Sequence, residues 1–213
     1  MEPFTTHRGV ICLLDRGNVD TDQIIPKQFL KSIKKTGYGE NLFFDWRYTE
    51  SGELHPDFEL NQPRHEGASI LLAGNNFGCG SSREHAVWAV MQYGFRVVIA
   101  PRNESGGAVI PGFADIFRNN SIKNGLLTVE VTADQVALVK EALQHEERLE
   151  ATVDLPAQTI TLHEPGRELD GEERVIEFFI DPAAKTRLTQ GLDDIGLTLQ
   201  HEAAVTAFEK QRA

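Results

Sequence analysis

The chain has 213 residues, of which 32 are acidic and 21 basic, so its formal net charge is −11. This length suits one domain with a sizeable core, and the acidic balance, without a basic cluster, argues against nucleic-acid binding. No apolar segment has the length of a membrane span or of a signal sequence, and two cysteines give no disulfide framework, so we expect a cytoplasmic protein with no membrane partner.

The N-terminal segment opens with an apolar run over residues 9–14, which predicts the first strand. Cys12 lies inside this run, so we expect it to be a buried structural thiol. In the polar stretch that follows, Asp20, Thr21 and Asp22 can bond the local backbone. A turn or helix cap and a functional role are both open for these three residues.

The centre of the chain joins a strand, a glycine-spaced loop and a helix. Residues 70–73 predict a short strand, and Ser81 followed by Glu84 has the pattern of a capping box at a helix start. A helix that begins after such a loop directs backbone N–H groups at an anion. The loop adds the hydroxyls of Ser81 and Ser82 and the guanidinium of Arg83, which can clamp a carboxylate. We therefore predict an active-site loop, although a capped helix beside a tight turn explains the same residues.

The second half of the chain continues the alternation of strands and helices. Further strands are predicted by apolar, β-branched runs over residues 96–100, 126–131, 151–162 (two strands around a turn) and 175–180. Helices are predicted over residues 133–143, 185–190 and 203–210, the first of them with a capping box formed by Thr132 and Gln135. The strand–helix–strand spacing around the central loop predicts a parallel βαβ unit.

The central loop matches neither the dinucleotide fingerprint, the P-loop nor the nucleophile elbow. Its full string, Phe77-Gly-Cys-Gly-Ser-Ser-Arg-Glu-His85, resembles the signature of the swivelling domain of the aconitase superfamily. The similarity continues, in the same order, through Asn18 to Pro26, Gly37 to Trp46, Phe113 to Leu127 and Gly191 to Leu199. Within the superfamily the chain resembles the small subunits of 3-isopropylmalate dehydratase. The resemblance implies one α/β domain over residues 1–213, a three-layer β/β/α swivelling domain with a C-terminal helical extension.

The same resemblance implies a hydro-lyase of leucine biosynthesis that isomerises 2-isopropylmalate to 3-isopropylmalate by dehydration and rehydration. Ser81 is the implied catalytic base and Arg83 the implied clamp for a substrate carboxylate, which fits the negative charge that such a reaction develops. The Ser81 hydroxyl is also the expected N-cap acceptor. Ser82, Asp22 and Gly80 are the implied substrate-binding residues.

Family members shape a substrate side-chain pocket with the segment 26–35, which makes Phe29, Leu30 and Ile33 candidates for a specificity loop. No metal site is expected, because an iron–sulfur cluster needs more thiolates than Cys12 and Cys79 provide. The resemblance places a 4Fe–4S cluster on a large subunit, which would pair with this chain as a heterodimer and share a small dicarboxylate substrate.

Residues 103–112 depart from the family pattern, because relatives pass almost directly from the segment like Ala100-Pro-Arg102 to the one like Phe113-Ala-Asp. Their Gly-rich, polar composition predicts an exposed loop that is dispensable for folding, although a position beside the active site is also open. Two other functions are open: a related hydro-lyase, such as homoaconitase or citraconate/methylmalate hydratase, and a non-catalytic anion-binding module of the same fold.

Overall fold

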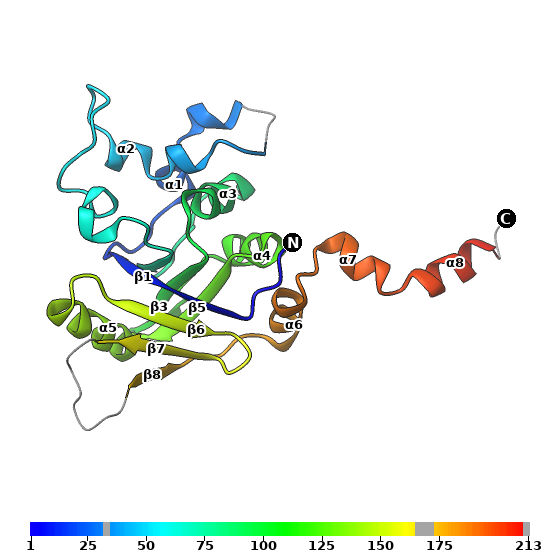
Figure 1. Ribbon diagram of the computed structural model, residues 1–213. Coiled ribbons are helices and arrows are strands. Elements are labelled where there is room, and N and C mark those ends of the chain that lie inside the picture. The colour runs from blue at the N-terminus through cyan, green and yellow to red at the C-terminus, as the bar shows by residue number, and fades with distance from the viewer. Residues whose placement is uncertain (32–34, 165–172, 211–213) are drawn as a thin grey trace.

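The computed structural model describes residues 1–31, 35–164 and 173–210. These residues form a layered body from which the last two helices extend (Figure 1). Two β layers and one helical layer make up the body, which confirms the predicted β/β/α class. Among the described residues, no helix is both long enough and apolar enough to cross a bilayer.

Strand β1 (Thr6–Leu14) belongs to both β layers. Its residues 11–14 pair in parallel with β2 (Ile70–Ala73), whereas its residues 6–10 pair antiparallel with β6 (Glu150–Asp154). The described strands follow the order β4-β3-β2-β1-β6-β7-β8, and β5 also pairs with β3. The other strands are β3 (Val97–Ser105), β4 (Ala108–Ile110), β5 (Leu127–Thr132), β7 (Thr159–His163) and β8 (Arg174–Glu177).

Successive side chains of the parallel strands face opposite layers. Leu71 packs toward the helices and Leu72 toward the antiparallel sheet, and all four residues of β2 are buried. A strand covered on both faces needs a continuous apolar run rather than an alternating one, and this is what the sequence provides. Cys12 is fully buried on the helical side, as predicted.

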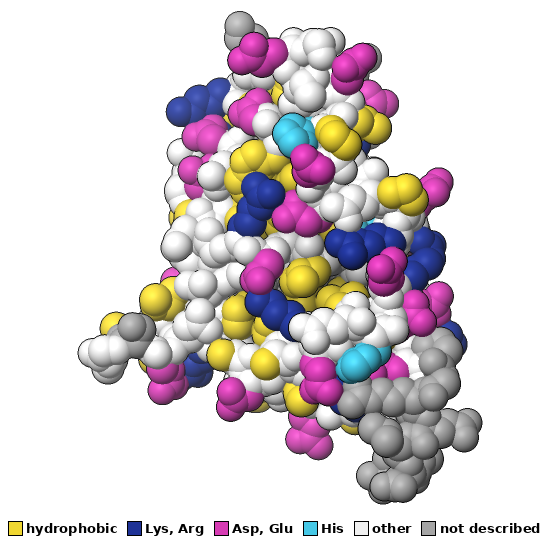
Figure 2. Space-filling model, turned by 90° about the vertical axis from the view of Figure 1, so that its left-hand side faces the viewer, with side chains coloured by type: hydrophobic (Ala, Val, Ile, Leu, Met, Phe, Trp, Pro, Cys, Tyr) yellow, Lys and Arg dark blue, Asp and Glu magenta, His cyan; other side chains and the backbone are white. Residues whose placement is uncertain are grey.

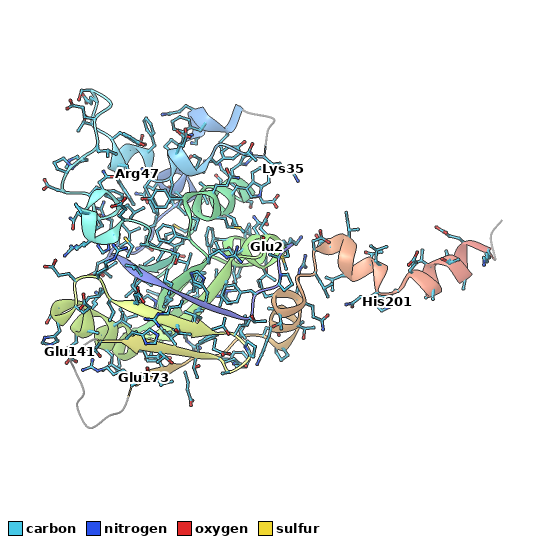
Figure 3. All side chains as sticks on the ribbon, in the orientation of Figure 1. Glu2, Lys35, Arg47, Glu141, Glu173 and His201 are labelled. Carbon is cyan, nitrogen blue, oxygen red and sulfur yellow. The ribbon has the colours of Figure 1, made fainter. Side chains whose placement is uncertain are left out.

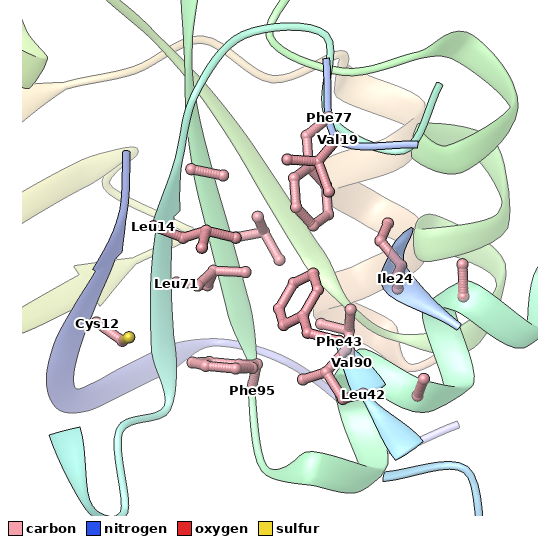
Figure 4. Close-up of a cluster of buried hydrophobic side chains, with 14 of the residues drawn as sticks. Cys12, Leu14, Val19, Ile24, Leu42, Phe43, Leu71, Phe77, Val90 and Phe95 are labelled. Atoms are coloured by element: carbon pink, nitrogen blue, oxygen red, sulfur yellow. The ribbon is translucent and has the colours of Figure 1, made fainter. Parts of the chain in front are cut away.

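The helical layer contains α1 (Thr21–Ile24), α2 (Phe44–Arg47), α3 (Glu84–Tyr93) and α4 (Asp115–Asn124). Their apolar side chains and those of the parallel sheet form one core, part of which Figure 4 shows around Phe43, Phe77 and Phe95. Short 3-10 helices cover Lys27–Lys31, Gly39–Asn41, Glu59–Asn61 and Pro63–His65.

The second core lies between the two β layers and includes one side of α5 (Ala133–His145). Thr132 and Gln135 cap this helix reciprocally, which confirms the predicted capping box. The chain ends with α6 (Pro182–Gln190), α7 (Asp194–Leu199) and α8 (Glu202–Lys210). On the face in Figure 2, Asp and Glu side chains are more numerous than the Lys and Arg side chains interspersed among them, in keeping with the acidic balance of the chain.

Most of residues 103–112 are exposed, as predicted, but the structure corrects the prediction that they form a loop. The segment is a β-hairpin in which Asn103 pairs with Ile110 and Ser105 with Ala108, and Gly106 and Gly107 form the turn at positive φ. The tip is exposed, but Gly112 is buried. The hairpin forms because glycine allows the positive φ that the turn requires. The polar side chains of the segment do not prevent its two strands from pairing through their backbones.

Candidate active site

The loop between β2 and α3 is bound along one edge by the segment that enters α1. The Gly78 N–H donates to the Val19 carbonyl at 2.8 Å, and the Thr21 N–H donates to the Cys79 carbonyl at 2.9 Å. The Thr21 hydroxyl then donates to the carbonyl of Ser81 at 3.0 Å. Because these bonds alternate across two segments far apart in the sequence, they fix the path of the loop to Ser81.

The other edge of the same loop is bound by the end of the hairpin segment. The Asn76 N–H donates to the Pro111 carbonyl at 2.9 Å, and the Phe77 N–H donates to the Gly112 carbonyl at 2.9 Å. The Gly112 N–H in turn donates to a carboxylate oxygen of Glu130 at 2.8 Å. The root of the hairpin therefore supports the loop, although its tip does not contribute to this contact.

Two glycines give the loop its curvature. Gly78 has φ +76° and Gly80 has φ +88°, both in the left-handed region that side chains disfavour. A Cβ on Gly78 would lie 2.3 Å from Cγ of Phe117, so the loop also needs the missing side chain for packing. A Cβ on Gly80 would be 3.4 Å from Asp20, at ordinary contact distance, so only the backbone conformation calls for glycine there.

The structure corrects the predicted capping box at the start of α3. The helix begins at Glu84 with Arg83 at the N-cap position, and no side chain caps it. Ser81 and Ser82 are exposed and lie before the helix, and the Glu84 carboxylate instead accepts the Asn124 amide at 2.8 Å. The bond from Thr21 to Ser81 and the curvature at Gly80 hold the serines off the helix axis. The Ser81 hydroxyl is therefore not used as a cap, and within the described part of the chain no side chain at the N-cap position bonds the first turn of α3.

Arg83 and Asp22 form an ion pair that brings two of the predicted site residues together. Lys27 lies 3.4 Å from the same carboxylate. The hydrogen bond from Arg83 holds the pKa of Asp22 below its ordinary value, and the charge of Lys27 lowers it further. The Arg83 side chain is 15% exposed, so the guanidinium is largely enclosed while Asp22 still faces solvent. A dicarboxylate that binds Arg83 would compete with Asp22 for the guanidinium.

Two of the three candidate specificity residues lie beside this ion pair in sequence and pack against the helical layer. Phe29 and Leu30 are half-buried in the 3-10 helix Lys27–Lys31, and the ring of Phe29 meets Phe44 edge to face at 4.8 Å. Ile33 lies outside the described residues. The contacts with the core fix the positions of Phe29 and Leu30, and their role in specificity stays a prediction.

The cysteines are poorly suited to hold a cluster. Burial raises the pKa of the Cys12 thiol to about 12, and burial with the nearby charge of Asp20 raises the pKa of Cys79. Metal ligation requires thiolates, which both environments disfavour. Cys79 instead donates to the Asn18 carbonyl at 3.4 Å. Within the described parts of the chain, no group of three or more His, Cys, Asp or Glu side chains is arranged to hold a metal ion.

Sequence reasoning missed the positioning role of Thr21. This residue is 2% exposed, and its hydroxyl and backbone N–H both bond the Ser–Arg loop. A helix cap was one of the roles left open for Asp20. The structure confirms it, since Asp20 is the N-cap of α1 and forms a capping box with Gln23. The position of Thr21 between Asp20 and Asp22 could have indicated a role at the site. Its partner could not be read from the sequence, because Ser81 is 60 residues away.

Comparison with known proteins supports one family. The family model of the aconitase C-terminal domain matches residues 1–134, and a model of the C-terminal domain of the 3-isopropylmalate dehydratase small subunit matches residues 194–213. A protein of Desulforapulum autotrophicum named 3-isopropylmalate dehydratase small subunit is 54% identical over all of this chain and 96% of its own length. Proteins of the same name from Bacillus licheniformis and Halalkalibacterium halodurans are each 51% identical over all of this chain, and over 98% and 100% of their own lengths.

The fold has a solved counterpart as well. The crystal structure of 3-isopropylmalate dehydratase from Methanocaldococcus jannaschii aligns with a TM-score of 0.61 at 21% identity, covering 95% of this chain and 98% of that one. This likeness supports the three-layer architecture alone. From the family-model match and the full-length identity above 50%, the chain belongs to the aconitase C-terminal domain family and, within it, to the small subunits of 3-isopropylmalate dehydratase.

Proposed function

We propose that this chain supplies one wall of the active site of 3-isopropylmalate dehydratase, the hydro-lyase of leucine biosynthesis. The reaction removes water from 2-isopropylmalate and adds it back so that the hydroxyl moves from C2 to C3. One observation carries the proposal: a chain 54% identical to a small subunit of this name holds two exposed serines and an enclosed guanidinium on one fixed loop.

Arg83 would bind the substrate carboxylate next to the carbon that loses its proton. Negative charge builds on that carboxylate as the C–H bond breaks, and a planar guanidinium can hold both of its oxygens. The enclosure of Arg83 strengthens this contact, because a charge interaction is weakened less away from water. Asp22 would hold the guanidinium in position until the substrate carboxylate replaces it.

Ser81 would take the proton. A serine hydroxyl is ordinarily a poor base, so it needs positive surroundings to act as one. The loop provides them through Arg83 and through the N-terminus of the ten-residue helix α3, which no side chain caps. Ser82 and the backbone at Gly80 lie on the same exposed turn and would bond a substrate carboxylate.

The departing hydroxyl needs a Lewis acid, and two cysteines are too few to supply the thiolates of a cluster. The proposal therefore places a 4Fe–4S cluster on the large subunit, where it would supply that chemistry when bound. The large subunit would also close the site against water, since Ser81 and Ser82 are exposed in this chain alone. The assembly is expected in the cytoplasm.

Reconstitution tests the proposal. The purified chain should be folded and inactive alone, and activity on 2-isopropylmalate should appear and saturate near a one-to-one ratio when the large subunit is added without oxygen. The Ser81→Ala variant should bind the large subunit normally and lose turnover. Full turnover by the isolated, iron-free chain would refute the assignment of roles. Preferential turnover of homocitrate-type or methyl-substituted malates would instead favour a related hydro-lyase.

A further inference from the structure

The last two helices form a C-terminal arm, residues 194–210, that extends from the body (Figure 1). None of the residues of α7 or α8 is buried. In Figure 3, His201 lies along this arm, well away from the side chains of the layered body. The arm is therefore helical without a core of its own to support it.

Large apolar side chains are exposed on the arm. Ile195 is 71% exposed, Leu199 is 58% exposed and Val205 is 42% exposed. Ile195 and Leu199 are four residues apart, so they lie on the same face of α7. Helices of six and nine residues are marginal in water without tertiary packing, so a covering surface is needed to stabilise them.

The root of the arm is fixed to the body. Asp194 pairs with Arg187 at 2.6 Å and with Lys123 at 3.5 Å, and Asp193 caps α7 by accepting the Gly196 N–H at 2.7 Å. Lys123 belongs to the last turn of α4, whose final residue, Asn124, donates to Glu84 at 2.8 Å. The root of the arm is therefore attached to α4, the helix that also contacts the start of α3.

The family comparison separates the arm from the rest of the fold. The aconitase C-terminal domain model ends at residue 134, whereas residues 194–213 match a model named for the small subunit. The arm therefore matches a model named for the separate small subunit, outside the part of the chain that the aconitase C-terminal domain model matches. A separate small subunit must bind the large subunit that completes its site, and an exposed arm fixed to the body at its root can take part in that binding.

We propose that the C-terminal arm docks its Ile195 and Leu199 face into an apolar groove of the large subunit. The inference rests on the proposed function for the identity of the partner. Asp193 and Asp194 are engaged at the root, which leaves the exposed Glu202 at the start of α8 as an acidic side chain that a basic side chain on the rim of the groove could pair with. The proposed binding mode is that of an amphipathic helix that lies in a groove and contacts it through side chains spaced one turn apart.

The test compares two full-length double variants with the wild type. Ile195→Ser/Leu199→Ser alters the arm, and Leu138→Ser/Val175→Ser alters exposed apolar residues on α5 and β8, 43% and 54% exposed, away from the arm. Affinity for the purified large subunit is measured by sedimentation, and hydrogen exchange is measured over residues 195–210. Circular dichroism melting confirms that both variants keep the stability of the body.

We expect the arm variant to bind the large subunit on the order of 10- to 100-fold more weakly, and the control variant to stay within about threefold of the wild type. Amides of the arm should exchange fast in the free chain and become protected in the complex. If the wild type binds while the arm variant binds equally well and the arm stays unprotected, the inference is overturned and the proposed function stands.

Two other outcomes also decide the matter. If the wild type shows no affinity for the large subunit, the proposed function falls and takes the inference with it. If the wild type forms concentration-dependent dimers that the arm variant cannot form, while both bind the large subunit equally, the arm serves a second copy of this chain and the inference is wrong.

Discussion

Substitution of Gly78 by alanine should test whether the curvature of the Ser–Arg loop is enforced by packing. The new Cβ would lie 2.3 Å from Cγ, 2.5 Å from Cβ and 2.5 Å from Cδ2 of Phe117. Rotation of the Phe117 side chain does not move its own Cβ, so the clash cannot be relieved by a new rotamer. Either α4 or the loop must shift, and the loop bond from Gly78 to Val19 would be strained.

The cost has two parts. A non-glycine residue in the left-handed region costs about 1–2 kcal/mol. Overpacking a rigid core contact adds roughly 1–3 kcal/mol. The sum for Gly78→Ala is about 2–5 kcal/mol. Gly67 is the matched control, because its φ is +70° and nothing lies within 4 Å of its built Cβ, so Gly67→Ala should cost only the first part.

Urea unfolding of both variants measures the difference, with thermal melting as a second readout, since 1 kcal/mol shifts the Tm of a chain of this size by about 2–4 °C. The reconstituted enzyme should also lose kcat/KM with Gly78→Ala and keep it with Gly67→Ala. If Gly78→Ala unfolds within about 0.5 kcal/mol of Gly67→Ala, the loop adapts freely and the packing argument is refuted.

Three further predictions concern the site and its support. Arg83→Lys should lower kcat/KM of the reconstituted enzyme by roughly 2–4 kcal/mol, because lysine lacks the planar fork, and near-normal turnover would remove Arg83 from the mechanism. Replacing residues 104–109 by Gly-Gly should leave the Tm nearly unchanged, whereas deleting residues 103–112 should lower it clearly, because Phe77 then loses the Gly112 carbonyl. Asp22 has a folded pKa below its unfolded value of about 4, so its contribution to stability is present above pH 4 and lost as pH falls through the folded pKa. The stability difference between the wild type and Asp22→Asn should therefore be constant near neutral pH and shrink as the pH falls below about 4, and a difference that grows in acid would contradict the ion pair.

Local patterns predicted much of the fold. The apolar run at Ile70 identified the strand β2, and the spacing of Thr132 and Gln135 located the start of α5. These predictions succeed because caps and apolar periodicity depend on residues close together in the chain. The alternation of strands and helices was sufficient to predict an α/β domain.

Long-range contacts decided the points where sequence reasoning failed. Ser81 has the right spacing from Glu84 for a cap, but the hydroxyl of Thr21 binds the Ser81 carbonyl and Asn124 takes the Glu84 carboxylate. The sequence implicated Asp22 in the site but did not name its partner, because Arg83 is 61 positions away and only the topology brings the two together. No local rule could have ranked these partners above the nearer ones.

The shared strand β1 has a consequence for how the body moves and unfolds. A slip of one residue in its register would exchange Ile11 and Cys12 between the two cores, so both β layers depend on a single alignment. Neither sheet can detach while this strand stays whole, so the body should melt as one cooperative unit and exchange its sheet amides together. A swivelling motion against the large subunit would then move the Ser–Arg loop as part of a rigid body. The relative positions of Ser81 and Arg83 would stay the same during that motion.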